Sequence, residues 1–111
     1  MKVDDYPVIE YKILHYLYGC IKIGAKPDIR KIDEKALCIN QKYWEWIMRM
    51  LQGDRHIVGV FESQDDGIQI GELSITAEGA RYLLTSEIMK NAKALIKDTK
   101  SLLPKVEASE I

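Results

Sequence analysis

The amino-acid sequence predicts a single α+β domain that is mainly helical. Three observations predict this class: helical periodicity over most of the chain, one central stretch that alternates as paired strands do, and capping residues between the segments. The chain has 111 residues, of which 47% are hydrophobic and 30% are charged. This length suffices for one core without disulfides or metals. We therefore expect one domain over residues 1–104, with a C-terminal helix at about 86–103, and a loose tail at 105–111.

The balance of charges limits the classes of partner. The chain carries 16 Lys and Arg residues against 17 Asp and Glu residues, which gives a formal net charge of -1. Bulk attraction to nucleic acids or membranes is therefore excluded. No apolar run reaches the roughly 18 residues of a membrane span, and the start of the chain lacks the apolar stretch of a signal peptide. We expect a cytoplasmic protein with no membrane partner.

The first predicted helix covers residues 6–23. Asp5 can act as its N-cap, Pro7 suits its first turn, and Gly24 can end it. Between these signals, apolar residues recur at the spacing of a helix, which is the main argument for this element.

A short second helix is expected before the next long one. Pro27 favours an extended backbone, after which Asp33 can cap a short helix at 33–37. The two cysteines, Cys20 and Cys38, each lie inside an apolar segment, and we expect both thiols to be buried.

The third predicted helix covers residues 41–52, with Asn40 as its N-cap and Gly53 at the position that favours a left-handed stop. At about 100° per residue, its apolar side chains fill an arc of roughly 200° and its polar side chains an arc of roughly 100°. We therefore expect this helix to be buried on most of its circumference. Trp46 lies at the edge of the apolar arc, and we expect it to complete the core.

A β-hairpin is predicted after the third helix. Residues 57–62 are β-branched and aromatic, residues 63–67 form a turn cluster, and residues 68–75 alternate between apolar and polar. We expect a bulge near Gly71, because a glycine inside a strand pattern often marks one.

Two helices are expected to follow the hairpin. Thr76 can cap a short helix at 77–84. Thr85 or Ser86 can then cap a final helix that Pro104 ends.

The final helix carries two opposite faces. An apolar stripe follows alternating steps of four and three residues. This stripe either packs on its own domain or pairs with a second copy of the chain in a homodimer, and the sequence leaves both open. The candidate dimerisation residues are Ile88, Ala92, Leu95, Thr99 and Leu102. The opposite face is a basic ridge of Lys90, Lys93, Lys97 and Lys100.

This order of elements is that of a winged helix-turn-helix with an extra C-terminal helix. The hairpin takes the place of a two- or three-stranded wing, and the third helix takes the place of the helix that enters the major groove of DNA. Its polar residues are candidate base readers, because Arg suits guanine and Gln suits adenine. The candidate DNA-binding residues are Gln41, Lys42, Glu45 and Arg49 on this helix, with Lys35 and Arg55 beside it.

Three short segments carry a resemblance to a known family. They are YKIL at 11–14, IVGV at 57–60 and TAEGARYL at 76–83. In these segments the chain resembles the YjcQ family, small proteins of bacteria and their phages, and the resemblance extends from residue 11 to about residue 103. The resemblance implies a winged-helix fold and transfers no catalytic residue.

No constellation of catalytic residues is recognisable. The sequence contains none of the common phosphate-binding, nucleophile or metalloprotease motifs. Its paired acids are sequence neighbours whose side chains diverge, so they make poor acid-base pairs. The spacing of the two cysteines and two histidines matches no known zinc motif. We expect a protein that is not an enzyme and that uses no cofactor and no metal.

Two functions remain open at this point. The first is a regulator of bacterial or phage origin that binds double-stranded DNA as a dimer. The second is a protein-interaction module of the same fold without nucleic-acid binding. Residues 57–85, which include the hairpin, contain five acidic residues and one arginine, whereas a wing that follows phosphate groups should be basic.

Overall fold

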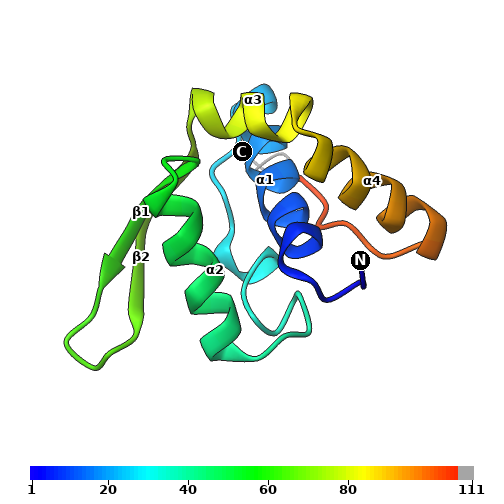
Figure 1. Cartoon of the computed structure of the whole chain (residues 1–111). Helices are drawn as coiled ribbons and strands as arrows, with labels where there is room; N and C mark the ends of the chain where they lie inside the picture. Colours follow the sequence, from blue (N-terminus) through cyan, green and yellow to red (C-terminus); the bar gives the residue numbers. More distant parts are fainter. Residues whose placement is uncertain (108–111) are drawn as a thin grey trace.

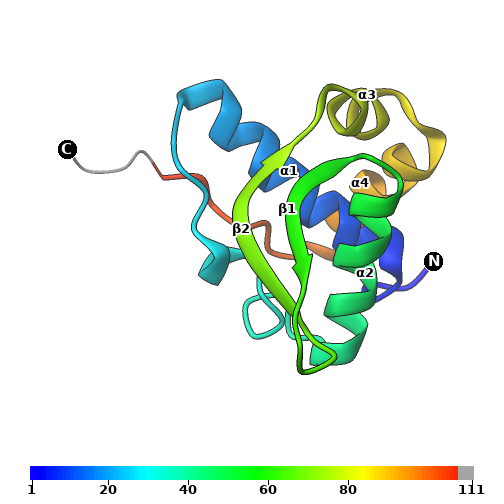
Figure 2. The same cartoon turned by 90° about the vertical axis from the view of Figure 1, so that its left-hand side faces the viewer.

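The computed structural model describes residues 1–107 and confirms an α+β architecture that is mainly helical (Figure 1). Four α-helices and one two-stranded antiparallel sheet make up the described part of the chain. The hairpin and the last helix lie on opposite sides of the molecule, with the first helix between them (Figure 1, Figure 2). In chain order the elements are α1 (Tyr6–Ile23), the short 3-10 helix η1 (Ile29–Lys31), α2 (Gln41–Gly53), β1 (Ile57–Glu62), β2 (Ile68–Ile75), α3 (Ala77–Thr85) and α4 (Glu87–Thr99).

Helix α1 is the centre of the fold. It contacts α2, α3, α4 and strand β2, so every other described α-helix packs against it. Residues on most of its circumference are buried, and Val8, Ile13 and Leu14 are completely shielded from solvent. The nearly continuous apolar sequence of this helix is therefore explained by contacts on several sides.

Both ends of α1 confirm the predicted boundaries. Asp5 is the N-cap residue, but its carboxylate accepts a hydrogen bond from the backbone N–H of Lys2 (2.8 Å) instead of one from the helix. Pro7 lies in the first turn, where a missing N–H does no harm. Gly24 ends the helix with φ of 71°, a left-handed conformation that glycine adopts without strain.

The predicted second helix at 33–37 is a single helical turn. Asp33 caps this turn as expected, since its Oδ1 accepts a hydrogen bond from the backbone N–H of Ala36 (2.9 Å). Cys38 then adopts a left-handed conformation with φ of 57°, which closes the turn and prevents a second one. The side chain of Cys38 is exposed, which corrects the expectation that both thiols are buried; Cys20 is buried.

Two hydrogen bonds fasten the linker between α1 and α2 to these helices. The indole Nε1–H of Trp44 donates to the carbonyl of Ile32 (2.8 Å), and both residues are buried. The hydroxyl of Tyr16 accepts a hydrogen bond from the backbone N–H of Asp28 (2.8 Å). These bonds satisfy polar groups that the packing would otherwise leave unpaired.

Helix α2 begins as predicted but ends differently. The Oδ1 of Asn40 accepts hydrogen bonds from the backbone N–H groups of Lys42 (2.7 Å) and Tyr43 (3.3 Å), which defines the start of the helix. Gly53 does not adopt the predicted left-handed conformation but forms the last helical residue. Arg55 takes the left-handed position with φ of 63°, where its N–H and that of the next residue close the last turn.

The hairpin confirms both predicted strands. The sequence predicts two or three strands here, and the sheet has two in the described residues. Its register shifts between Val58 and Val60, and the predicted bulge near Gly71 lies opposite this shift. Gly59 has φ of 105° there, and a Cβ on this residue would collide with the backbone of Glu72. Only glycine fits this position.

Helices α3 and α4 confirm the last two predicted helices, with one correction. Thr76 and Ser86 are their N-caps, and each side-chain oxygen accepts a hydrogen bond from the backbone N–H three residues later. Helix α4 ends at Thr99, earlier than expected, because Lys100 adopts a left-handed conformation with φ of 54°. The chain has therefore left the helix before it reaches Pro104.

The chain after α4 turns back along α1. The hydroxyl of Ser101 accepts a hydrogen bond from the ammonium group of Lys12 (2.7 Å). Val106 packs against Gly19, where a Cβ would collide with it. The first part of the predicted tail therefore contacts the domain, and residues 108–111 lie outside the described residues.

One carboxylic acid is buried in the core. Glu10 on α1 is 2% exposed, and its Oε1 accepts a hydrogen bond from the hydroxyl of Tyr82 on α3 (3.2 Å). The ring of Tyr82 stacks on that of His56, with centroids 4.3 Å apart. Burial is the main cause that raises the pKa of Glu10 from 4.5 to about 7, and the Asp54 carboxylate adds to it against the lowering effect of the Tyr82 bond.

The free energy of unfolding should therefore fall as the pH rises from 4.5 to about 7. In this range the unfolded chain releases the Glu10 proton while the folded chain retains it. Glu10→Gln keeps an acceptor for Tyr82 and has no proton to lose. We expect this variant to be more stable than the wild type by about 3 kcal/mol well above pH 7 and equally stable at acidic pH.

Urea denaturation at a series of pH values measures this difference. Glu78→Gln, at an exposed position on α3, is the matched control and should follow the wild type. If the free energy of unfolding of Glu10→Gln changed with pH just as that of the wild type does, the raised pKa of Glu10 would be contradicted.

Candidate interaction site

Several polar side chains of α2 are engaged within the domain. Glu45 is 8% exposed, and its carboxylate lies beside Gly67 in the hairpin turn. The Gln52 amide binds the backbone of Val60 twice: its N–H donates to the carbonyl (2.5 Å), and its oxygen accepts the N–H (2.7 Å). Gln52 thereby satisfies the edge of β1 as a neighbouring strand would.

Arg49 is held by the same hairpin. Its Nε and Nη2 donate to the two carboxylate oxygens of Glu62 on β1, at 2.8 and 3.1 Å, and Nη2 also donates to the carbonyl of Asp66 (3.0 Å). The hydrogen bonds between the two side chains raise the pKa of Arg49 and lower the pKa of Glu62. Three hydrogen bonds within the domain therefore occupy this guanidinium group.

Helix α2 exposes an aromatic patch, formed by Tyr6, Tyr43 and Trp46. Trp46 is 49% exposed, which corrects the expectation that it completes the core. Its ring meets Tyr6 edge-on, with centroids 5.8 Å apart, and stacks near-parallel with Tyr43, with centroids 6.3 Å apart. Trp44 occupies the core instead, because its indole N–H reaches the buried carbonyl of Ile32.

Two carboxylates lie near Tyr43 in the aromatic patch, and the exposed Lys42 lies one helical turn before Trp46. The hydroxyl of Tyr43 donates to the backbone carbonyl of Asp4 (2.7 Å). Burial first, and then the negative charges of Asp4 and Asp5, raise the pKa of Tyr43. The hairpin that packs on α2 carries the exposed carboxylates of Asp65 and of Glu62, which pairs with Arg49.

The other predicted DNA-binding residues are exposed but spread out. Lys35 lies in the turn before α2, Gln41 and Lys42 lie in its first turn, and Arg55 follows its C-terminal end. Lys42 and Arg55 are thus separated by about 20 Å along the helix axis. The structure places these side chains along the length of α2 without gathering them at one point.

The predicted dimerisation stripe is largely packed within the domain. Ala92 is completely buried, and Ile88 and Leu95 pack against the core. Thr99 is exposed, and its hydroxyl donates to the carbonyl of Leu95 (2.7 Å). Leu102 is 87% exposed and lies beyond the end of α4. These contacts favour the alternative that α4 packs on its own domain.

The basic ridge of α4 faces a different part of the surface. Its four lysines, Lys90, Lys93, Lys97 and Lys100, line a groove between α1 and α4. Helix α1 stands between α4 and α2 (Figure 1). The ridge and the exposed cations of α2 therefore lie on two helices that α1 separates.

Residues 1–107 offer neither a metal site nor a membrane-spanning helix. No group of three His, Cys, Asp or Glu side chains in this range is placed to hold a metal ion. None of the described helices combines the length and the apolar character needed to cross a membrane. The two thiols differ in environment, since Cys20 is buried and Cys38 is exposed.

Fold and site together define a small α+β protein whose hairpin is fastened to an aromatic-bearing helix. Comparison with protein families matches residues 11–102 to YjcQ, described as YjcQ protein. Because this match covers most of the chain, the protein belongs to the YjcQ family, which confirms the resemblance seen in the sequence. No curated protein and no solved structure matches the chain.

The aromatic patch is the surface that the sequence pattern does not indicate. A helical wheel assigns Trp46 to the apolar arc but does not tell which part of that arc meets the core. Tyr6 comes from the start of α1, and only tertiary packing brings it to Trp46. The one available signal is the width of the apolar arc, which exceeds what a single core contact covers.

Arg49→Ala should loosen the tip of the hairpin without unfolding the domain, because it removes three hydrogen bonds at a partly exposed site. We expect hydrogen exchange of the Ser63 backbone N–H, which donates to Gly67 (2.9 Å), to accelerate about tenfold. Exchange in α1 should be unchanged. Arg81→Ala, at an exposed position on α3, is the control, and an unaltered Ser63 rate in Arg49→Ala would disprove the role of this clamp.

Proposed function

We propose that the protein is a winged helix-turn-helix domain that binds a protein partner through the aromatic patch on α2. The order of α1, linker turn, α2, hairpin and α3 supports the winged-helix assignment. In this assignment α2 corresponds to the recognition helix, and the hairpin to the wing. Helix α4 is an addition that packs on α1 and α3.

The pairing of Arg49 with Glu62 carries this proposal. A helix that reads DNA needs its arginine free to meet a guanine edge or a phosphate. Here a bidentate contact of Nε and Nη2 of Arg49 with a guanine edge or a phosphate would require breaking hydrogen bonds to Glu62 and to the Asp66 carbonyl. The hairpin carboxylate therefore acts as an internal competitor for any phosphate.

The aromatic patch has the chemistry of a protein-binding surface. Trp and Tyr are enriched among the residues that dominate interface energies, because each buries a large apolar area while keeping a polar atom for a hydrogen bond. Trp46 already contacts Tyr6 and Tyr43. Its ring therefore loses little side-chain freedom on binding. We infer that an apolar anchor of the partner packs on Trp46.

The charges around the patch specify the partner further. Carboxylates of Asp4 and Asp5 lie near Tyr43, at one side of the patch. Complementary charge favours a partner segment with Lys or Arg beside its apolar anchor. The same carboxylates disfavour a phosphate backbone.

Trp46→Ala should abolish capture of the partner, because loss of a central aromatic anchor weakens binding by about thirtyfold or more. The measurement is affinity capture from nuclease-treated cell extract, followed by titration of the captured protein against wild type and variant. Phe61→Ala is the matched control, since Phe61 is an exposed aromatic residue on β1 (59%). It should retain the partner.

Two results would contradict the protein-binding proposal. One is capture of a partner with the same affinity by wild type and Trp46→Ala. The other is recovery of specific DNA fragments in place of a protein. Circular dichroism and thermal denaturation of both variants verify that they are folded before capture.

The second candidate function is a DNA-binding regulator. It is favoured by the exposed cations Lys35, Lys42 and Arg55, which could contact phosphates at the two ends of α2. A homodimer would then set two copies of α2 about 34 Å apart to read half-sites one helical turn apart.

Salt-dependent binding to mixed-sequence duplex DNA separates the two candidates. If α2 binds DNA, Lys35→Ala with Lys42→Ala should reduce the slope of log affinity against log salt by about two, one for each lost phosphate contact. Because the carboxylates beside α2 repel phosphate groups, we expect the double variant to leave this slope unchanged. Fluorescence anisotropy of labelled duplex measures the slope, and the double variant Lys26→Ala, Lys105→Ala is the control. A slope that falls in the Lys35 and Lys42 double variant but not in this control would favour the DNA-binding regulator.

A further inference from the structure

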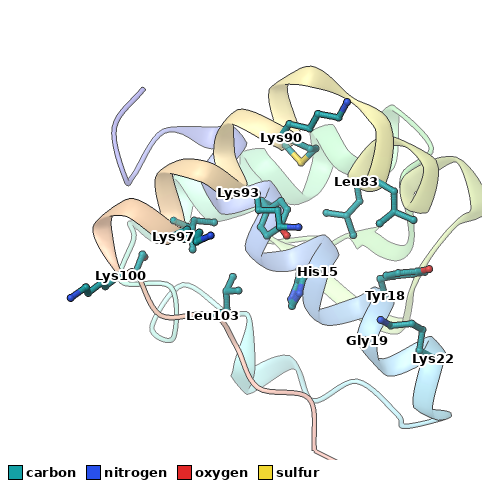
Figure 3. Close-up of a pocket in the computed structure, with 15 residues that line it drawn as sticks. His15, Tyr18, Gly19, Lys22, Leu83, Lys90, Lys93, Lys97, Lys100 and Leu103 are labelled. Carbon is teal, nitrogen blue, oxygen red and sulfur yellow. The ribbon is translucent and has the colours of Figure 1, made fainter.

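A groove of about 770 Å³ lies between α1 and α4 (Figure 3). Its walls come from α1, the C-terminal end of α3, α4 and the segment that follows α4. Small-molecule sites in proteins typically have volumes of roughly 300–1,000 Å³. The groove therefore has the size of a ligand site, and it shares no residue with the aromatic patch.

The rim of the groove is basic. Among the described residues that line it, none is Asp or Glu. Glu87 lies outside the lining and pairs with Lys90 at 3.6 Å. The lining lysines are Lys22 on α1 and Lys90, Lys93, Lys97 and Lys100 on α4 and at its cap. Such a concentration of ammonium groups favours an anion.

The floor of the groove is apolar. Leu83 comes from α3, Met89 and Ile96 come from α4, and Leu103 comes from the segment after it. Met89 and Ile96 are also part of the buried core, so the floor is held in place by the rest of the domain. A ligand that matches this groove has an apolar body as well as a negative charge.

His15 projects from α1 into the groove (Figure 3). Its Nδ1 is shielded from solvent and has no hydrogen-bond partner among the described residues. Burial first, and then the charges of Lys22 and Lys93, lower the pKa of this imidazole. His15 is therefore neutral at pH 7, and the positive charge of the groove resides on the lysines.

We propose that this groove binds a small amphipathic carboxylate. The apolar body of the ligand lies against Leu83, Leu84 and Leu103, on the floor that the buried Met89 supports from below, and its carboxylate pairs with Lys93 and Lys97 at the rim. The lysines supply charge complementarity, and the buried apolar floor supplies the larger part of the affinity. This site would make the domain responsive to a ligand, whichever macromolecule α2 binds.

The shape of the groove argues against two other anionic partners. A nucleic-acid backbone would pair with the lysines but would leave the apolar floor uncovered. An acidic peptide needs a groove that is open along its length, whereas Ser101 and Leu103 of the segment after α4 form a wall here. A compact ligand satisfies both the floor and the rim.

Isothermal titration calorimetry with dodecanoate tests the proposal on the whole chain. We expect binding in the micromolar range. Lys93→Ala with Lys97→Ala should weaken it about tenfold, because each partly exposed ion pair contributes modestly. Lys26→Ala with Lys35→Ala removes two exposed lysines outside the groove and should leave the affinity unchanged.

Two further probes separate the contributions of body and head group. Butyrate has the same head group without the long apolar body, and dodecyltrimethylammonium has the same body with the opposite charge. Both should bind at least about tenfold more weakly than dodecanoate. The methyl resonance of Met89 should shift on addition of dodecanoate, which places the ligand in the groove.

Four outcomes would overturn the proposal. They are no binding of dodecanoate, equal affinity for dodecyltrimethylammonium, equal affinity in the Lys93 and Lys97 double variant, and an unshifted Met89 resonance. Binding of duplex DNA or of an acidic peptide that depends on the same lysines, without binding of dodecanoate, would assign the groove to a macromolecule. None of these measurements depends on the partner of the aromatic patch.

Discussion

The burial of α1 on most of its circumference is the constraint on which the rest of the structure depends. Every other described α-helix and strand β2 pack on this helix, so its few polar residues lie where elements meet. Glu10 meets Tyr82 of α3, and its burial raises its pKa to about 7, while Lys12 meets Ser101 after α4. His15 faces the groove between α1 and α4. The polar positions of one helix therefore account for the buried acid and for part of the groove.

A second dependence links the hairpin to α2. Gln52 satisfies the exposed edge of β1, and Arg49 holds the tip of the hairpin, so two residues of α2 fasten it along its length. A hairpin that is fastened in this way forms one surface with the helix beside it. Of the predicted DNA-binding residues on α2, Arg49 is held by these bonds and Glu45 is buried, whereas Gln41 and Lys42 stay exposed. Trp46 is the large apolar side chain that α2 exposes. The internal bonding of the fold thus decides which chemistry α2 offers.

The sequence predicts the elements of this fold better than its surfaces. Caps, turns and periodicity are local, and they correctly indicate all four helices, both strands and the bulge opposite Gly59. The errors in the helix ends arise where a residue other than glycine adopts the left-handed conformation, as Arg55 and Lys100 do. The exposure of Trp46 and the pairing of Arg49 with Glu62 depend on contacts between separate elements, which a helical wheel does not contain. The sequence predicts the lysines of the groove as a basic ridge on one helix. It does not predict the apolar floor beside them, because that floor combines residues of several elements.

The left-handed turn at Cys38 has a practical consequence. It turns the side chain of Cys38 outward two residues before the cap of α2, while Cys20 is buried and its thiol pKa is raised by burial. Thiol reagents react with accessible thiolates, so a maleimide dye should attach at a single position of the native protein. That position adjoins the helix that carries Trp46. The unmodified chain thus contains a built-in attachment point for a fluorescent reporter of whatever approaches α2.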